Sequence, residues 1–393
     1  MRFVILNTDY PAFLHSLYSR YSELESAPYD HQMLVRIDSL FGMADFYSSN
    51  LRKLGHEAYD IFVNNKPMQM AWVREHHIQW KDQTRKEQWW ARSLQLLRHI
   101  AGQTPLRHLK PVFGPMLRSL DHQESELVTI LEPQIKHYRP DVLLNLAMDD
   151  ISPTIFRRLK AHVRLLVGQH AAPLPTNEDY SVYDLIISSL PNFVRYFREI
   201  GIPAEFHRLG FELRVLDKLR LMDRDIPASF VGSLSAHHSD RMHLLEYLSA
   251  HLDLQVWGPG VDNLPAQSWI HRRYQGPAWG IEMYQILRNS KITLNHHIGE
   301  AECYANNMRL FEGTGVGTLL ITDWKVNLHE MFEPGKEVVA YHTPEECADL
   351  VRFYLKNDSE RKKIALAGQR RCLQEHTYYQ RMQKLVALIS GYF

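Results

Sequence analysis

The sequence predicts an α/β protein made of two doubly wound domains that face a cleft. Short apolar segments alternate with helical segments along most of the chain, which is typical of parallel sheets covered by helices on both faces. The alternation stops once, in the charged segment 211–227, and then starts again. A chain of 393 residues is also too long for one ordinary domain.

The first half of the chain begins with an apolar strand that ends at Asn7-Thr8-Asp9. A loosely helical stretch, 14–54, follows and closes at Gly55. Further helices are predicted at 127–138, 153–163 and 192–200. The strands are predicted at 2–6, 56–63, 142–146, 164–168, 183–189 and 204–207.

Segment 70–120 differs in composition and is predicted to be a helical insert in this first domain. It contains nine Lys or Arg side chains against three acidic ones, and four tryptophans: Trp72, Trp80, Trp89 and Trp90. One interpretation is an amphipathic insert whose tryptophans pack inward. The other is a basic surface that lies on an anionic membrane or receives an anionic, lipid-linked acceptor.

The second half repeats the alternation. Strands are predicted at 228–234, 254–260, 291–297 and 318–323, with helices at 239–252, 280–290 and 307–317. Three more helices, 344–357, 359–376 and 378–392, complete the chain. Segment 211–227 has no clear period and is predicted to be the inter-domain linker.

Composition excludes several classes of protein. The 45 basic and 45 acidic side chains balance, so no uncompensated basic coat for nucleic acid is expected. No apolar run is long enough to span a bilayer, and the apolar run at the N-terminus is too short for the core of a signal peptide. Three cysteines without paired or metal-like spacing suit a reducing compartment. We expect a soluble, cytoplasmic protein.

The junction after residue 231 is a candidate anion site. A strand runs into Gly232-Ser233, and a helix starts near Ser239 with Arg241 in its first turn. Free N–H groups at a helix start and a guanidinium both favour phosphate. The plainer interpretation is an ordinary strand–glycine–helix connection, and no lysine-bearing phosphate loop occurs.

A second junction adds a carboxylate. The strand ending at His296-His297 leads to a helix that is capped by Asn306 or Asn307 and carries Glu312. A carboxylate has two acceptor oxygens and can bond both hydroxyls of a ribose. The alternative is a solvated glutamate on a helix surface.

Residues 228–390 resemble the spore-maturation-protein-like (CgeB-like) group of GT-B glycosyltransferases. The resemblance rests on "NMRLFEGTGVGTLLITD", "LHEMFEPGKEVVAY", "ERKKIALAGQRRCLQEHTYYQRM" and the upstream "YQGPAWGIEMYQILRNSKITLN". It implies two Rossmann-like domains: 1–213 on the acceptor side and 214–377 for the nucleotide sugar, with helix 378–393 crossing back to the first domain. Where the wider superfamily has a first glutamate, eight positions before Glu312, this chain has Tyr304.

The resemblance also implies an activity, namely transfer of a sugar from a nucleotide-diphosphate donor to a glycan, lipid-linked or protein acceptor in the cleft. This activity would belong to glycan biosynthesis for the cell envelope. The protein would then be cytoplasmic and could contact the inner face of the membrane peripherally. The expected donor-binding residues are Gly232, Ser233, Arg241, His297, Asn307, Arg309 and Glu312. We expect no cofactor and no metal, because helix dipoles and cationic side chains neutralise the departing diphosphate. The alternatives are a nucleotide-sugar epimerase of the same fold and a non-catalytic nucleotide- or sugar-binding protein.

Two residues of the first domain are candidates for contact with sugar or acceptor. His170 follows strand 164–168 and Asp9 follows the first strand, so both are expected at the carboxyl edge of the sheet. Either could act on the acceptor hydroxyl; the plainer interpretation of His170 is a loop histidine. Asp223-Arg224-Asp225 matches a D-x-D metal string but lies in the charged linker, and we expect solvated charge there.

Overall fold

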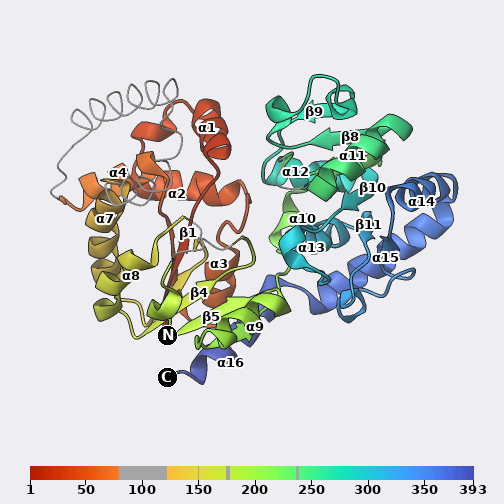
Figure 1. Ribbon diagram of the computed structural model, residues 1–393. Coiled ribbons are helices and arrows are strands. Elements are labelled where there is room, and N and C mark those ends of the chain that lie inside the picture. The colour runs from red at the N-terminus through yellow and green to blue at the C-terminus, as the bar shows by residue number, and fades with distance from the viewer. Residues whose placement is uncertain (79–121, 149, 174–177, 236–238) are drawn as a thin grey trace, which may run out of the picture.

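The computed structural model describes residues 1–78, 122–148, 150–173, 178–235 and 239–393. Two parallel six-stranded sheets, each covered by helices on both faces, lie side by side (Figure 1). The predicted α/β fold with two doubly wound sheets is therefore confirmed. Of the predicted insert 70–120, only residues 70–78 are described; they include the end of α4 (Lys66–Glu75). Trp80, Trp89 and Trp90 lie outside the described residues.

The first sheet has the order β2-β1-β3-β4-β5-β6, and every neighbouring pair is parallel. Its side chains alternate between two cores, since Phe3 and Ile5 join one cluster while Val4 and Leu6 join the other. The strands are β1 (Arg2–Asn7), β2 (Glu57–Phe62), β3 (Val142–Asn145), β4 (Leu165–Gln169), β5 (Leu185–Ser188) and β6 (Ala204–Phe206).

Helices of the first half divide between the two faces of this sheet. One face packs against α7 (His122–Tyr138), α8 (Pro153–Leu159) and α9 (Pro191–Glu199), and the other against α3 (Phe46–Lys53). The stretch predicted to be loosely helical consists of α1 (Pro11–Arg20), α2 (Tyr29–Asp38) and α3. Pro11, Pro153 and Pro191 stand at the first helical positions, where a missing N–H costs nothing.

The second sheet has the order β12-β11-β10-β7-β8-β9 and is also parallel throughout. Its strands are β7 (Ile226–Val231), β8 (Leu254–Trp257), β9 (Tyr274–Gly276), β10 (Ser290–Asn295), β11 (Leu319–Asp323) and β12 (Val339–Tyr341). The sequence did not predict β9 and β12, which have three residues each and lie at the two edges of the sheet.

Helices again cover both faces of this sheet. α11 (Ser239–His251), α14 (Pro344–Lys356) and the first half of α15 (Asp358–Glu375) pack on one face. On the other face lie α12 (Ile281–Asn289) and α13 (Met308–Gly315).

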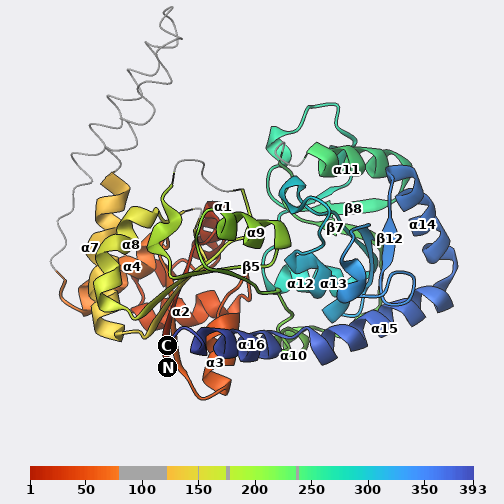
Figure 2. The same cartoon turned by 60° about the horizontal axis from the view of Figure 1, so that its bottom comes forward.

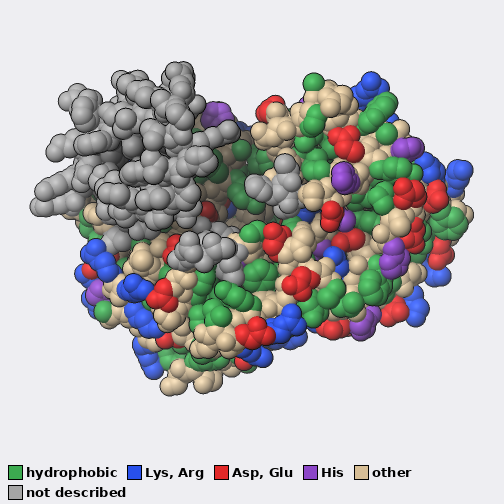
Figure 3. Space-filling model, viewed as in Figure 1, with side chains coloured by type: hydrophobic (Ala, Val, Ile, Leu, Met, Phe, Trp, Pro, Cys, Tyr) green, Lys and Arg blue, Asp and Glu red, His purple; other side chains and the backbone are tan. Residues whose placement is uncertain are grey.

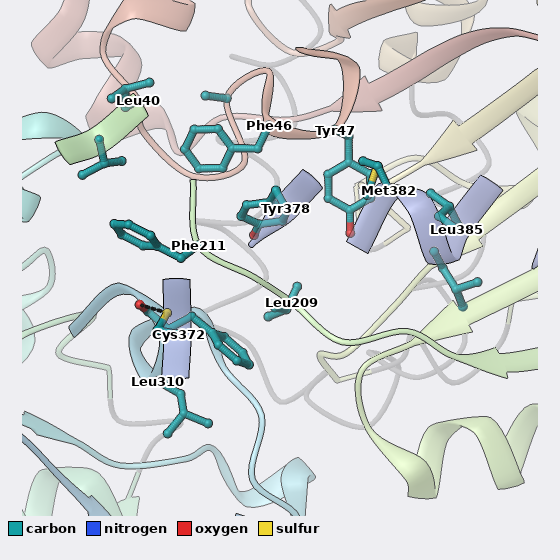
Figure 4. Packing of buried hydrophobic residues seen from close by; sticks show 14 of the residues in the cluster. Leu40, Phe46, Tyr47, Leu209, Phe211, Leu310, Cys372, Tyr378, Met382 and Leu385 are labelled. Carbon is teal, nitrogen blue, oxygen red and sulfur yellow. Dashed lines mark hydrogen bonds between the residues drawn. The ribbon is translucent and has the colours of Figure 1, made fainter. Parts of the chain in front are cut away.

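The last helix, α16 (Tyr378–Ser390), returns to the first half and lies against α3 (Figure 2). Tyr378 packs on Phe46 and Tyr47, at ring-centroid distances of 5.2 and 5.7 Å. Around it, side chains from α3, α13, α15 and α16 form one continuous apolar cluster (Figure 4). The two halves therefore share a core, which fixes how their sheets face each other. The boundary at residue 213 stays a prediction.

The linker is more ordered than its composition indicates. It contains the short helix α10 (Arg214–Lys218), and Arg214 bonds Asp45 of α3 at 2.6 Å and Glu212 at 2.9 Å. Arg224 is not a solvated charge, because its guanidinium donates to the carbonyls of Arg288, Ser290 and Gly317 at the ends of α12 and α13. The main chain at those helix ends has carbonyls without helical partners, which the guanidinium satisfies.

A buried carboxyl in the first half should make stability depend on pH. Asp60 of β2 bonds Ser48 and Asn7, and burial raises its pKa to about 7. A raised pKa means that the folded protein holds this proton more tightly than the unfolded chain does. The resulting stabilisation is complete below about pH 4 and is lost as the pH rises through 7.

Asp60→Asn keeps the shape and removes this ionisation. We expect its Tm to exceed that of the unchanged protein by about 2–4 °C at pH 8 and to differ little at pH 4.5, measured by thermal unfolding. The exposed Asp349→Asn is the control and should shift neither value. An equal shift at both pH values would contradict this account.

Candidate active site

The candidate donor site lies at the carboxyl edge of the second sheet. β10 is the central strand there, between β7 and β11, so the segments that follow these three strands meet. Gly232-Ser233 follows β7, His296-His297 follows β10, and β11 ends at Asp323. The sequence predicted a ligand site at the first two of these junctions.

Arg241, in the first turn of α11, contacts two of these segments. Its Nη2 donates to the His296 carbonyl at 3.1 Å, and its Nη1 lies 3.5 Å from the Ser233 carbonyl. Burial lowers its pKa; Asp323 opposes that shift and Arg309 adds to it. Its buried Nε has no hydrogen-bond partner in the part of the chain that the structure describes. Arg241 thus brings a positive charge with an unused donor to the end of β7.

Arg309, on α13, brings a second guanidinium to the same strand end. Its Nη2 donates to the Val231 carbonyl at 2.8 Å, and its Nη1 forms an ion pair with Glu312 Oε2 at 2.8 Å. Its Nε is buried without a partner. Besides burial, the charge of Arg309 contributes to lowering the pKa of Arg241, so an anion bound beside the two guanidinium groups would be favoured.

The α13 helix is capped by Asn307, the second of the two predicted candidates. Its Oδ1 accepts from the Leu310 N–H at 3.1 Å, and its Nδ2 donates to Asn295 at 2.8 Å. The neighbouring Asn306 is 6% exposed, and no described residue bonds its Oδ1 or its Nδ2. A buried, unpaired amide is costly, which makes Asn306 a candidate ligand contact. Sequence reasoning treated it only as an alternative cap and missed it.

Glu312 is buried, so the solvated-surface alternative is wrong. Its Oε1 accepts from the Tyr284 hydroxyl at 3.2 Å, and its Oε2 pairs with Arg309. Burial, and then the Glu312 charge, raise the pKa of Tyr284 well above its usual value, so this hydroxyl stays a donor. Each carboxylate oxygen retains a second acceptor site. The carboxylate can therefore accept from a ligand while holding Arg309 in place.

His297 and Asp323 form a hydrogen-bonded pair beside the two arginines. Asp323 Oδ1 lies 2.7 Å from His297 Nδ1 and accepts from the His297 backbone N–H at 3.1 Å. Burial alone would raise the pKa of Asp323, but the bond and charge of His297 outweigh it and hold the pKa well below its usual value. The carboxylate orients the ring, and the opposite nitrogen, Nε2, is buried without a partner. Sequence spacing placed His297 here but gave no sign of Asp323 as its partner.

The two candidates in the first half lie in different surroundings. His170 follows β4, packs on Phe193 and bonds the Ala172 carbonyl through Nε2; burial lowers its pKa to about 4. Asp9 is enclosed in a two-bond ion pair with Arg36, whose guanidinium lies 4.2 Å from the Phe62 ring centroid. Its side chain is 0% exposed, so the structure does not support Asp9 as a base at the rim of the sheet. The sequence contains no local signal that Arg36, 27 residues away, occupies this carboxylate.

The two halves face each other across a hollowed surface (Figure 3). Asn192 of α9 donates to the Glu300 carbonyl at 2.9 Å, and Trp279 packs on Phe41 with ring centroids 5.1 Å apart. A hollow of about 430 Å³ lies between α1, α2 and the start of α12, beside Trp279. None of the candidate donor-binding residues lines it. The structure therefore brings the donor candidates together at one edge and leaves His170 and Asp9 on the opposite half.

Comparison with known proteins gives this arrangement a context. Residues 241–387 match the family model described as "Glycosyl transferase-like". HepE of Anabaena, solved with UDP and glucose, aligns over 100% of both chains at 12% identity with a TM-score of 0.56. The fold is that of the GT-B glycosyltransferases. A glycosyltransferase from Rickettsia africae (12% identity, TM-score 0.56, 100% and 98% covered) has the same fold. So does sucrose-phosphate synthase from Thermosynechococcus elongatus (9% identity, TM-score 0.57, 100% and 99% covered).

The comparisons do not identify a subgroup, and the described structure adds an observation on metal ions and one on membranes. No curated protein sequence matches the chain significantly, and the CgeB-like subgroup stays a prediction. Within the described ranges, no group of three or more His, Cys, Asp or Glu side chains is arranged to hold a metal ion. Among the described helices, none is long and apolar enough to cross a membrane.

Proposed function

We propose that the protein is a glycosyltransferase that moves a sugar from a nucleotide-diphosphate donor to an acceptor between its two halves. The observation that carries this proposal is the set of buried polar atoms, at the carboxyl edge of the second sheet, that have no partner among the described residues. They belong to Arg241, His297, Asn306 and Arg309. Native proteins rarely leave such atoms unpaired, and a bound anionic donor would satisfy them. The GT-B fold and the matched family model support the same activity.

In this proposal Arg241 and Arg309 hold the donor phosphates, with Gly232-Ser233 and the start of α13 beside them. Charge develops on the diphosphate as the bond to the sugar breaks. Fixed guanidinium groups in a water-poor site stabilise that charge in the transition state more than in the ground state. Glu312 would accept from the ribose hydroxyls while its ion pair positions Arg309.

The nucleotide base of the donor and the acceptor are proposed on separate grounds. HepE is described in complex with UDP and with UDP-glucose, so we propose a UDP-sugar as the first donor to test. A glycan, a lipid-linked chain or a protein would approach from the first half, where we propose that His170 contacts the sugar or the acceptor. Its neutral ring suits a hydrogen bond to a hydroxyl. Glycan biosynthesis for the cell envelope, in the cytoplasm, remains part of the proposal.

Calorimetry with UDP, GDP, dTDP, ADP and CMP would identify the base, and a donor-hydrolysis assay would show turnover. Turnover of UDP-sugar to a second UDP-sugar without acceptor would favour an epimerase. Binding without any turnover, across a panel of sugars and acceptors, would favour a non-catalytic binding protein. No binding of any nucleotide would contradict the proposal.

We expect activity to survive removal of divalent metal ions. Arg241, Arg309 and the helix start supply the positive potential that a metal ion supplies in other transferases. Transfer rates measured with and without EDTA should agree within about twofold. Loss of turnover in EDTA, restored by Mn²⁺ or Mg²⁺, would contradict this mechanism.

A further inference from the structure

A second hollow, lined in part by basic side chains, lies just before the linker leaves the first half. It is lined by the end of β6, by His207-Arg208, by Glu330 of the second half and by α16, and measures about 310 Å³. That is the lower end of the range for small-ligand sites. Its walls belong to both halves and to the helix that joins them.

The charges around this hollow do not balance. Glu330 pairs with Arg208, and Glu205 pairs with Arg198 at 3.1 Å, so both lining carboxylates are already neutralised. Arg381 and Lys384 also line the hollow, and neither forms an ion pair with any described residue. Arg381 donates instead to the carbonyls of Leu209 and Glu375 and bonds His376. Two positive charges are left without a negative partner.

Polar atoms in the same walls lack partners. Nε of Arg208 and Nε2 of His207 are buried and bond no described residue, and the whole His207 residue is 4% exposed. The basic groups also repel one another: burial and then the charges of Arg381 and Arg208 lower the pKa of Lys384. Burial, followed by Arg381 and Lys384, lowers the pKa of His207 to about 3. An anion would relieve this repulsion and satisfy the unused donors.

We propose that this hollow, lined by His207, Arg208, Arg381 and Lys384, is a binding site for a small phosphate-bearing effector. Phosphate groups suit it because their oxygens accept several charge-assisted hydrogen bonds at once. A hollow of about 310 Å³ is large enough for one or two phosphate groups with a small substituent. Because β6, His207-Arg208, Glu330 and α16 all contribute, an occupant would contact both halves. It would add to the contacts of the shared core that already hold the two halves in the placement seen here.

Lys384 is the residue for the test, because it is exposed on α16 and makes no ion pair that folding depends on. Inorganic pyrophosphate is the main probe. Inorganic phosphate and glycerol phosphate are tested beside it, to tell whether the site prefers a diphosphate, a free phosphate ion or a phosphate ester. Titrations on the full chain should show saturable binding by calorimetry and a rise in Tm. Lys384→Ala should weaken that binding about tenfold, and Lys384→Glu should abolish it. Lys363→Ala, an exposed lysine on α15, is the matched control and should bind as the unchanged protein does.

Pyrophosphate can also enter the candidate donor site, so each titration is repeated with Arg309→Gln. A site in this hollow predicts that pyrophosphate binding persists in Arg309→Gln and is lost in Lys384→Glu. The reverse pattern, or no binding at all, would overturn this proposal. Loss of nucleotide binding in Arg309→Gln would test only the proposed donor site, because Arg309 does not line this hollow. Arg208→Gln is the second variant, and it should weaken pyrophosphate binding as Lys384→Ala does.

Discussion

Arg309→Gln should lower kcat/KM for the nucleotide-sugar donor by about 100- to 1000-fold. The guanidinium lies at the end of β7 with Nη2 on the Val231 carbonyl, Nη1 on Glu312 and a buried Nε without a partner. Removing one fixed donor that faces developing negative charge typically costs this much. Steady-state kinetics should show the loss mainly in kcat, because the charge on the diphosphate is greatest in the transition state.

The control must separate lost chemistry from lost structure. Arg352→Gln removes an exposed arginine of α14 that pairs only with Asp349 and, through its Nη2, the His251 carbonyl; its kinetics should not change. Thermal unfolding of Arg309→Gln should remain cooperative. The double variant Arg309→Gln/Glu312→Gln removes the ion pair without leaving an unpaired buried charge, and should recover stability but no activity. Unchanged kcat in a folded Arg309→Gln would remove Arg309 from the mechanism.

Much of the fold could be predicted because its strands are apolar and its helices have clear ends. β1, β3, β4 and β5 are buried on both faces and appear in the sequence as continuous apolar runs. β9 and β12 could not be predicted in this way. They have three residues each and lie at the two edges of the sheet, so the pattern of each is too short to identify a strand.

The candidate site could be predicted only where the residues concerned lie close together in the sequence, on one segment. The helix start at Asn307 and the carboxylate of Glu312 lie on one helix, five residues apart, and spacing along α13 suffices to relate them. Glu312 and Tyr284, or His297 and Asp323, meet only because β10, β11 and their helices pack together. The same limit applies to Asp9. Its position at the end of β1 was correct, but a partner on α2 determines what its carboxylate does.

Glu312→Gln should weaken UDP binding by roughly ten- to a hundred-fold. The buried carboxylate lies between Tyr284 and Arg309, and we propose that its remaining acceptor sites take the ribose hydroxyls. Losing hydrogen bonds from a charged acceptor costs on the order of 1.5–3 kcal/mol, and each 1.4 kcal/mol is tenfold in affinity. Tyr284→Phe removes only the hydroxyl on Oε1 and should change the Kd by less than about fivefold.

Two explanations of such a loss can be separated by changing the ligand. If Glu312 bonds the ribose, 2′-deoxy-UDP should bind the unchanged protein more weakly than UDP does, and Glu312→Gln should reduce or abolish that difference. This is a double-mutant cycle in which one of the two changes is made on the ligand. If Glu312 acts only by positioning Arg309, the UDP and 2′-deoxy-UDP affinities should fall by the same factor in the variant. A Kd for UDP that Glu312→Gln leaves unchanged in calorimetry would show that this carboxylate stabilises α13 and α12 and takes no part in donor binding.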